Sequence, residues 1–213
     1  MLLLLWCVLR GGAWADPNVE AERVVRQATD AVYHALREQC HSIEQEPERL
    51  YALIEEILLP YADFDRMTRW VLGKYSRRVS EQQRRDLVAE FRDVLIRTYA
   101  TAIQTVAPED IHYLPVRDTG KPDQVVVRTE IRQRGEAVVH IDYYMYRSGG
   151  EWLVYDIRVE GISLVINYRV SFASEIDARG ITGLIESLRQ QNQKPMSADT
   201  AKHIRSLQAD TCK

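Results

Sequence analysis

The sequence lacks the short motifs that identify the commonest enzyme classes. Its 213 residues contain no GxSxG, GxGxxG, Walker-type phosphate loop or HExxH pattern. Serine-hydrolase, dinucleotide-binding, nucleotide-hydrolysing and zinc-peptidase chemistries therefore have no support from a local motif. A strong charge of one sign is also missing, because 28 basic residues stand against 31 acidic ones and the net charge is only −3. This balance gives no electrostatic basis for binding nucleic acid.

Apolar runs long enough to cross a membrane are absent as well. The run from Leu2 to Leu9 is far shorter than the roughly 20 residues that a membrane-spanning helix needs. It leads to Ala13-Trp14-Ala15, an A-x-A site of the kind found at the end of secretory signals. We therefore predict that residues 1–15 are a cleavable signal peptide and that the mature chain begins at Asp16. The alternative is an N-terminus that is merely apolar and frayed.

Cysteine is scarce, with three residues in the chain. Cys7 falls in the predicted signal peptide, which leaves Cys40 and Cys212. An exported chain could pair these two, because disulfides persist in oxidising compartments. Cys212, however, lies in residues 192–213, a polar tail that we expect to be flexible, so the pairing stays open. Cys40 and His41 have no further ligand at metal-binding spacing, and we predict no metal site there.

The first half of the chain has the periodicity of helices. Apolar residues recur three and four apart in the segments 18–40, 47–60, 63–75 and 80–106. Ser80 and Gln83 form a capping box that predicts the start of the longest helix. Beyond Gly161 the helical period returns and continues to Gly180, and a short helix around Leu184 follows.

The second half changes to the alternation that is typical of strands. Four segments alternate apolar and polar residues, namely 111–116, 123–132, 136–147 and 151–160. Gly135 and Ser148-Gly149-Gly150 mark turns that would join the last three strands as hairpins. We predict one α+β domain over residues 16–191, with N-terminal helices packed on one face of a curved, antiparallel four-stranded sheet that is NTF2-like in outline.

The faces that this pattern turns inward are rich in aromatic and methionine side chains. Tyr143 and Met145 lie inward on the third strand. On the fourth strand strict alternation places inward Leu153, Tyr155, Ile157 and Val159. A wall of Tyr, Trp and Met suits an irregular ligand cavity, because Met adapts its shape and aromatic rings line ligand sites. For each single residue, an ordinary core position remains the alternative.

Two sets of polar residues are candidates for function. His140, Asp142 and Tyr144 share the outer face of the third strand, where they form either an acid–base group or, as we expect, a solvated sheet face. We predict no catalytic residue. Eight basic residues form either exposed charged helix faces or a rim that meets phosphates or an acidic partner: Arg66, Arg69, Lys74, Arg77, Arg78, Arg84, Arg85 and Arg92.

Four stretches of the sequence carry a family resemblance. DFDRMTRWVLGKY, FRDVLIRTYATA, EWLVYDIRVEGISLVINYR and FASEI resemble the MlaC family, also called the toluene-tolerance or organic-solvent-tolerance auxiliary family. The resemblance runs in the same order over residues 20–190. Two positions depart from the family pattern. SRR follows GKY where an aromatic residue is expected, and Ile166 stands where a small polar residue is commoner.

The resemblance implies a soluble periplasmic carrier of glycerophospholipids, not an enzyme, in the pathway that maintains outer-membrane lipid asymmetry. Its implied partners are an outer-membrane lipoprotein–porin complex and an inner-membrane ABC transporter complex with an MCE-domain protein. The acyl chains would lie between sheet and helices in a monomer without cofactor. We predict that the cavity wall is drawn from Phe64, Trp70, Tyr75, Phe91, Tyr99, Tyr143, Met145, Val154, Tyr155 and Val165. Val154 is included in case the strand register departs from strict alternation.

Two other functions remain open from the residues alone. An NTF2-like enzyme acting on a hydrophobic small molecule would need an acid–base group inside the cavity, whereas His140 and Asp142 are predicted outside. An adaptor with a filled core would bind no lipid. Ligand content therefore distinguishes a carrier from an adaptor.

Overall fold

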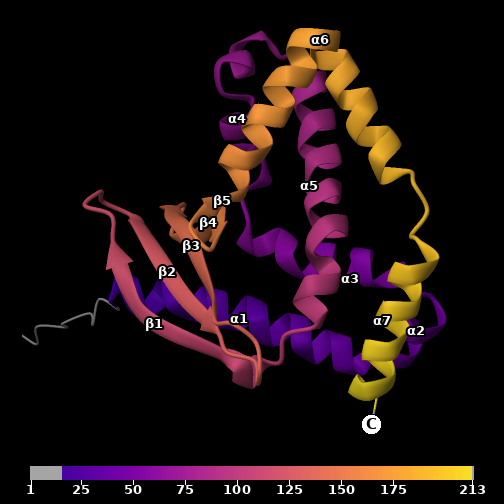
Figure 1. Ribbon diagram of the computed structural model, residues 1–213. Helices are drawn as coiled ribbons and strands as arrows, with labels where there is room; N and C mark the ends of the chain where they lie inside the picture. The colour runs from indigo at the N-terminus through magenta and orange to yellow at the C-terminus, as the bar shows by residue number, and fades with distance from the viewer. Residues whose placement is uncertain (1–15, 213) are drawn as a thin grey trace, which may run out of the picture.

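The computed structural model describes residues 16–212, so the predicted signal peptide lies outside the described residues. The helices are α1 (Pro17–Glu38), α2 (Cys40–Gln45), α3 (Arg49–Leu58), α4 (Phe64–Leu72), α5 (Glu81–Gln104), α6 (Leu164–Asn192) and α7 (Ala198–Thr211). The strands are β1 (Ile111–Asp118), β2 (Gln124–Ile131), β3 (Val139–Ser148), β4 (Glu151–Val159) and β5 (Ile162–Ser163), and Figure 1 shows their arrangement. No helix in this part of the chain is long and apolar enough to cross a membrane.

The strands form one antiparallel sheet in sequence order, β1-β2-β3-β4-β5. The predicted α+β class is confirmed, and the sheet has one strand more than predicted. The additional strand, β5, pairs with the end of β4 through a turn at Glu160 and Gly161, which have φ values of 50° and 78°. A strand of two residues has no alternation that a sequence pattern could reveal, which is why β5 was missed.

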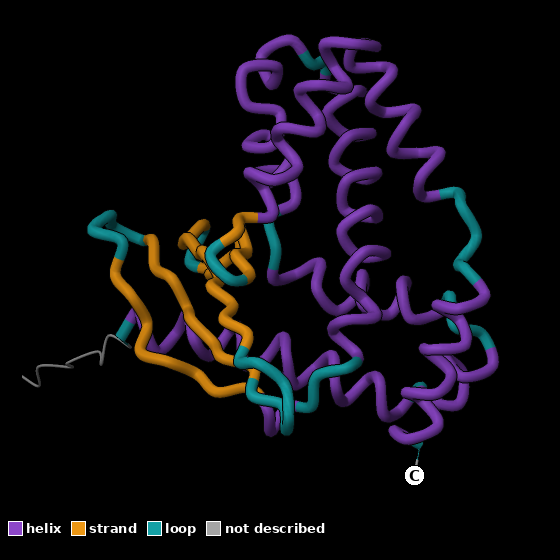
Figure 2. Tube along the Cα trace, in the orientation of Figure 1, coloured by secondary structure: helices purple, strands orange, loops and turns teal. Residues whose placement is uncertain are grey.

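Helices cover one face of the sheet and extend beyond it, as Figures 1 and 2 show. α1 contacts β1, β2 and β4, whereas α4 and α6 contact β4. α6 doubles back at Gly180, where φ is 72° and ψ is 179°, so its second half runs beside α5. The predicted helix break at Gly180 is therefore confirmed. The predicted capping box of Ser80 and Gln83 is also present, at the start of α5.

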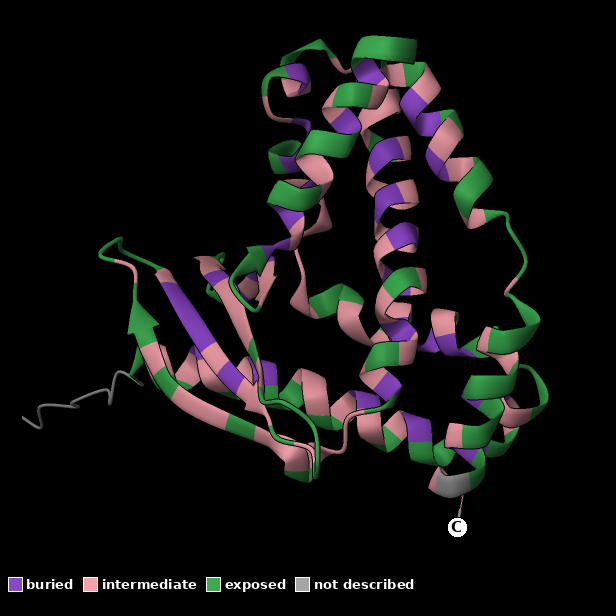
Figure 3. Ribbon diagram, viewed as in Figure 1, coloured by how far each residue is buried: buried purple, intermediate pink, exposed green. Residues whose placement is uncertain are grey.

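Buried apolar side chains form two clusters. The first, called here the sheet cluster, lies between the sheet and α1, α4, α5 and α6, and its members include Val25, Met67, Phe91, Val127 and Phe172. The second, the helical cluster, joins α1, α2, α3, α5 and α7 through residues such as Leu36, Ile43, Leu50, Ile96 and Ile204. α5 contributes buried residues to both clusters along its length (Figure 3). α5 therefore connects the two clusters.

The first turns of α4 and α6 are anchored on β4. Asp63 caps α4, and its backbone N–H donates to the carbonyl of Val154 at 2.9 Å. Asp156 is buried and accepts hydrogen bonds from the Ser163 hydroxyl at 2.7 Å and from the Val165 N–H at 3.2 Å. A buried carboxylate needs such donors, and the N-terminus of a helix is a favourable place for it. These bonds fix both helices against the edge of the sheet.

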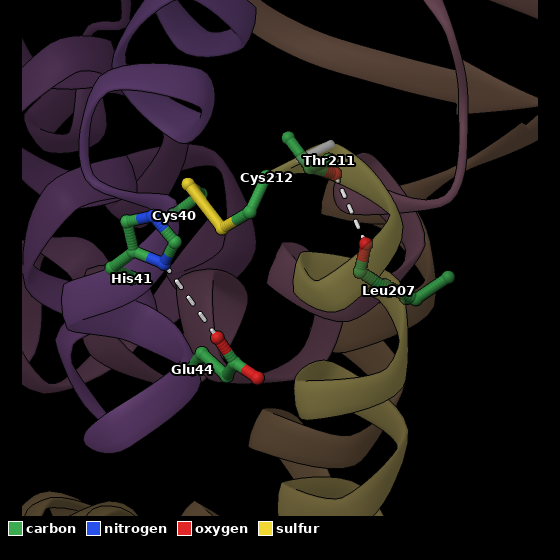
Figure 4. Close-up of a disulfide and its surroundings, with 6 residues drawn as sticks. All are labelled: Cys40, His41, Glu44, Leu207, Thr211 and Cys212. Carbon is green, nitrogen blue, oxygen red and sulfur yellow. Dashed lines mark hydrogen bonds and ion pairs between the residues drawn. A yellow bond between two sulfur atoms is a disulfide. The ribbon is translucent and has the colours of Figure 1, made fainter.

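The C-terminal residues differ from the flexible polar tail that the sequence suggested. Residues 198–211 form α7, which packs against α2 and α5 with Ile204 and Gln208 fully buried. Cys212 forms a disulfide with Cys40 at the start of α2 (Figure 4). Only a narrow stripe of α7 is apolar, and the polar composition of residues 192–213 therefore predicted a solvated, flexible tail. The disulfide and the contact with α2 supply the ordering that the local sequence lacks.

Candidate functional site

The predicted wall residues meet mainly in the sheet cluster. Seven of the ten belong to it or pack against it: Phe64, Tyr75, Phe91, Tyr143, Met145, Val154 and Val165. They come from β3, β4, α4, α5, α6 and the 3-10 turn Gly73–Arg78 that follows α4. The structure thus brings together residues from distant parts of the chain. Their role as the wall of a ligand site stays a prediction.

A β-bulge decides which side chains of β4 face the sheet cluster. Met145 pairs with Val154 and Tyr144 pairs with Asp156, so Tyr155 is an extra residue in β4. A bulge of this kind turns the following side chains to the other face of the sheet. Trp152 and Val154 therefore lie in the sheet cluster, and the predicted inward position of Tyr155 was wrong. Val154, which was included in case of such a register change, lies in the sheet cluster, and its role in a ligand wall stays a prediction.

The remaining predicted residues lie outside both clusters. Trp70 is 41% exposed on α4. Its ring centroid lies 5.0 Å from that of Tyr155, which is buried beneath it. Tyr155 also contacts the rings of Tyr144 and Tyr146 on the outer face of the sheet. Tyr99 is half-buried on α5, and burial raises the pKa of its hydroxyl. Trp70 and Tyr155 thus form an outer aromatic group rather than a part of the sheet cluster.

An aromatic triplet in the sheet cluster joins Phe91 to two residues that are not among the ten predicted ones, Tyr168 and Phe172. The ring centroid of Phe91 lies 5.1 Å from Tyr168 and 5.2 Å from Phe172, in edge-to-face geometry. Tyr168 and Phe172 are four residues apart on α6, one turn from Val165. This helical spacing was visible in the sequence and would have identified both. The interior is therefore more aromatic on its helical side than predicted.

Three tyrosines converge where α1 meets the sheet: Tyr33 of α1, Tyr113 of β1 and Tyr143 of β3. The Tyr33 hydroxyl donates to the carbonyl of Ile103 at 3.1 Å, and the Tyr113 hydroxyl donates to Thr29 Oγ1 at 3.4 Å. Burial raises the pKa of all three hydroxyls, that of Tyr143 to about 12. Tyr143 is nevertheless only half-buried by accessible area. A side chain that is desolvated yet reachable by water fits a concave wall.

Raising the pH above 10 is expected to destabilise the protein through these tyrosines. Their hydroxyls have an ordinary pKa of 10.0, and burial raises the value for Tyr143 to about 12. Below pH 10 both folded and unfolded forms hold the proton, so the contribution to stability is complete. Between pH 10 and 12 the unfolded chain releases the proton first. The free energy of unfolding then falls by up to about 1.4 kcal/mol for each pH unit and for each such tyrosine.

Urea unfolding at pH 8 and at pH 11 measures this effect. The Tyr143→Phe variant should lose less stability between the two pH values than the wild type does. The matched comparison is Tyr144→Phe, one residue along β3 on the other face of the sheet. Equal losses in all three proteins would show that Tyr143 does not contribute to the alkaline transition.

Two cavities in the described structure are lined by none of the ten predicted wall residues. One, of about 210 Å³, is lined by Tyr51, Arg97 and Lys194 among others. The second, of about 260 Å³, is lined by Tyr33, Arg37 and Gln104 among others. Both are smaller than typical sites for small-molecule ligands, which measure roughly 300–1,000 Å³. Neither cavity brings the predicted wall residues together, and we do not assign the ligand site to either.

Four of the eight basic residues between positions 66 and 92 form ion pairs on helix surfaces. Arg84 pairs with Asp65 and Glu81, Arg85 with Glu81, Arg69 with Asp65, and Arg92 with Glu55. The interpretation as charged helix faces therefore holds for these four. Arg66 differs, because its guanidinium lies 3.8 Å from the ring centroid of Tyr146. Among residues 16–212, no carboxylate lies within ion-pair distance of Arg66.

The candidate acid–base residues lie on the outer face of the sheet. His140 is exposed and approaches the carboxylates of Glu130 and Glu160. Asp142 lies 3.6 Å from Arg117. These contacts agree with a solvated sheet face and place no acid–base group in the sheet cluster. Near α7, Cys40, His41 and Cys212 lie close together, but the two sulfur atoms are bonded to each other and offer no thiolate to a metal.

The fold and the interior define a class of protein: helices over an antiparallel sheet, with an aromatic-rich apolar core between the two layers. This architecture suits binding of an apolar ligand rather than acid–base chemistry. Residues 26–190 match the family model described as "MlaC protein". The chain therefore belongs to the MlaC family, which confirms the resemblance found in the sequence. α7 lies outside the matched residues.

Several known proteins are similar to this chain. It is 25% identical over 176 residues to "Intermembrane phospholipid transport system binding protein MlaC" of Haemophilus influenzae, over 81% of this chain and 82% of the relative. It is 26% identical over 159 residues to "Toluene tolerance protein ttg2D" of Pseudomonas putida, over 74% and 73% of the two chains. A phospholipid-binding protein from Ralstonia solanacearum, solved in complex with a phospholipid, has a TM-score of 0.73 and 30% identity. That match covers 81% of this chain and 97% of the solved chain.

Proposed function

We propose that the protein binds a glycerophospholipid with its acyl chains between the sheet and the helices, and carries it through water. The observation with most weight is the solved relative from Ralstonia solanacearum, which holds a phospholipid and shares the fold over 81% of this chain. The sheet cluster supports the same location, because it gathers seven of the ten predicted wall residues between the two layers.

The energetics of such a carrier favour exchange rather than tight capture. Burying one methylene group is worth about 0.8 kcal/mol. Two chains of about sixteen carbons would contribute on the order of 20 kcal/mol relative to water. A bilayer supplies nearly the same free energy, so transfer between membrane and carrier is close to neutral. Direction then comes from differential affinity at the docking partners or from ATP use by a transporter.

Entry of the acyl chains requires the two layers to separate. The seven wall residues contact one another or their neighbours in the sheet cluster. The chains would therefore have to replace these contacts with contacts of their own. Met145 and the half-buried Tyr143 suit this role, because methionine adapts its shape and a half-buried ring can move at low cost. The helices that move with the wall would be α4 and α6, which meet the sheet at β4.

We further propose the cellular setting that the resemblance implies. The chain would be exported by its predicted signal peptide, residues 1–15, and act as a periplasmic monomer. It would exchange lipid with an outer-membrane lipoprotein–porin complex and with an inner-membrane ABC transporter complex that includes an MCE-domain protein. The name of the Haemophilus influenzae relative, which places that protein in an intermembrane phospholipid transport system, supports this setting.

Native mass spectrometry of protein purified from the periplasm without detergent tests the proposal. We expect a mass increment that equals one or more glycerophospholipids, identified after organic extraction. A control protein exported to the same compartment should carry none. If the purified protein contains no lipid and takes up none from liposomes afterwards, the result contradicts the proposal and favours an adaptor with a closed core.

A further inference from the structure

Exposed apolar side chains are concentrated on one side of the protein. Trp70 of α4, Ile162 of β5, and Ile166 and Val170 of α6 are 41%, 66%, 49% and 72% exposed. We call these four residues the apolar face. The other large apolar residues of comparable exposure, Val19, Leu59 and Val138, lie on separate elements. Scattered exposed residues are ordinary, whereas a group of them on adjoining elements indicates an interaction surface.

The four residues are held together by the connection between β5, α6 and α4. Ile166 and Val170 are four residues apart on α6 and therefore lie on one side of that helix. Ile162 belongs to β5, which ends directly before α6 begins. Arg169 joins α6 to α4, because its Nε donates to the carbonyl of Trp70 at 2.8 Å. Other sides of the same helices carry buried residues of the sheet cluster, such as Leu72 of α4 and Phe172 of α6. The apolar face therefore lies on the outer side of helices that also form the proposed cavity wall.

Aromatic rings and cations border the apolar face. Trp70 contacts Tyr155, and the Arg66 guanidinium lies 5.0 Å from the Tyr155 ring centroid and 3.8 Å from that of Tyr146. Arg169 is the only charged residue in the first eleven positions of α6, LVINYRVSFAS. The surface thus combines exposed Ile, Val and Trp with tyrosine rings and arginines.

The carboxylates of the neighbouring elements are already engaged. Asp63 caps α4 and accepts a hydrogen bond from the Tyr146 hydroxyl. Asp65 pairs with two arginines of α4 and α5. Asp177 accepts from the Tyr75 hydroxyl at 2.6 Å, and Glu160 lies beside His140. Within residues 16–212 neither Arg66 nor Arg169 lies within ion-pair distance of a carboxylate, so both guanidinium groups are able to pair with phosphates, although the net charge of the chain is −3.

We propose that the apolar face docks on the surface of a bilayer that contains anionic phospholipids. Tryptophan and tyrosine prefer the level of the lipid head groups. Arginine can pair there with phosphates while its stem lies along apolar surface. Ile162, Ile166 and Val170 would enter the outer edge of the hydrocarbon. Docking would bring the membrane against α4 and α6, whose inner sides belong to the proposed cavity wall, so the inference rests on the proposed function. Four apolar residues give weak, reversible binding, as a carrier needs.

Cosedimentation with sucrose-filled vesicles tests the inference. The wild type should bind vesicles of phosphatidylcholine mixed with phosphatidylglycerol, and binding should weaken as salt screens the charges over a Debye length of about 10 Å at 0.1 M. The double variant Ile166→Asp/Val170→Asp should bind the vesicles at least about tenfold more weakly than the wild type does. The control is Val19→Asp, which places one aspartate on an exposed apolar position of α1 and should bind as the wild type does.

Three outcomes would overturn the inference: no binding of the wild type to these vesicles, an equal loss of binding in Val19→Asp, or unchanged vesicle binding in the double variant. If vesicle binding is unchanged while capture by a membrane complex is lost, the face belongs to a protein partner. Native mass spectrometry of the same preparations separates this result from the proposed function. A double variant that is folded and carries lipid but no longer docks supports the inference. A wild type without lipid contradicts the carrier function independently of docking.

Discussion

Replacing Tyr143 by glutamate is expected to remove phospholipid from the protein while leaving it folded. Tyr143 lies in β3 and packs against the sheet cluster, yet it is only half-buried. A carboxylate at this position can therefore still be reached by water in the protein without lipid. Acyl chains that enter would strip this water, and the effective cost for a charge in apolar surroundings is several kcal/mol. Because exchange with the bilayer is otherwise close to neutral, the lipid content should fall more than about tenfold.

The matched control is Tyr144→Glu, the next residue along β3. Its side chain lies on the outer face, where the hydroxyl accepts a hydrogen bond from Arg117 and the Arg158 guanidinium lies 4.2 Å from the ring centroid. A glutamate there can pair with either arginine, so lipid content should not change. Lipid analysis by mass spectrometry, with circular dichroism to confirm folding, provides both measurements. A folded Tyr143→Glu protein with normal lipid content would remove Tyr143 from the wall.

Met145 is a poorer position for the same test. It is fully buried in the sheet cluster, so a charge there would be desolvated in the folded protein whether or not lipid is present. The expected result is loss of folding rather than selective loss of lipid. The sequence analysis predicted the same inward position for Tyr143 and Met145, because both belong to one face of the same strand. Their different burial follows from the packing of the helices above them.

Removing the disulfide is expected to lower the melting temperature by about 5 to 15 °C, because the stability of the fold falls by about 2 to 4 kcal/mol. Cys40 and Cys212 are 172 residues apart in sequence. A link over such a loop removes many conformations from the unfolded chain. It also holds α7, which has Ile204 as its fully buried apolar residue. The double variant Cys40→Ala/Cys212→Ala tests this expectation by calorimetry.

Reduced wild-type protein is the control for the disulfide prediction. It should melt close to the double variant, whereas a reductant should not change the melting temperature of the variant itself. Lipid content should stay the same in both, because α7 packs on the helical cluster and not on the sheet cluster. A variant that melts with the oxidised wild type would show that the packing of α7 alone maintains the C-terminal region.

The sequence predicted the strong periodic features well. The apolar period of 80–106, with Ser80 as cap, corresponds to α5, and the hairpin meander corresponds to β2, β3 and β4. These elements are long and their patterns are unambiguous, so local preference and tertiary packing agree. The sequence did not predict the bulge at Tyr155 or the strand β5. Both depend on how β4 meets its neighbours and not on the composition of β4.

The sequence by itself determined the family, the α+β class and a pool of apolar residues for the interior. Tertiary structure decided which of them meet. Because of the bulge in β4, the side chain of Val154 lies in the sheet cluster and that of Tyr155 lies in the outer aromatic group. Contact with α2 and a disulfide ordered a C-terminal helix whose own residues gave little signal. The physical reason is the same in each case: strand register and long-range contacts are set by partners distant in the chain, and periodicity reports only local preference.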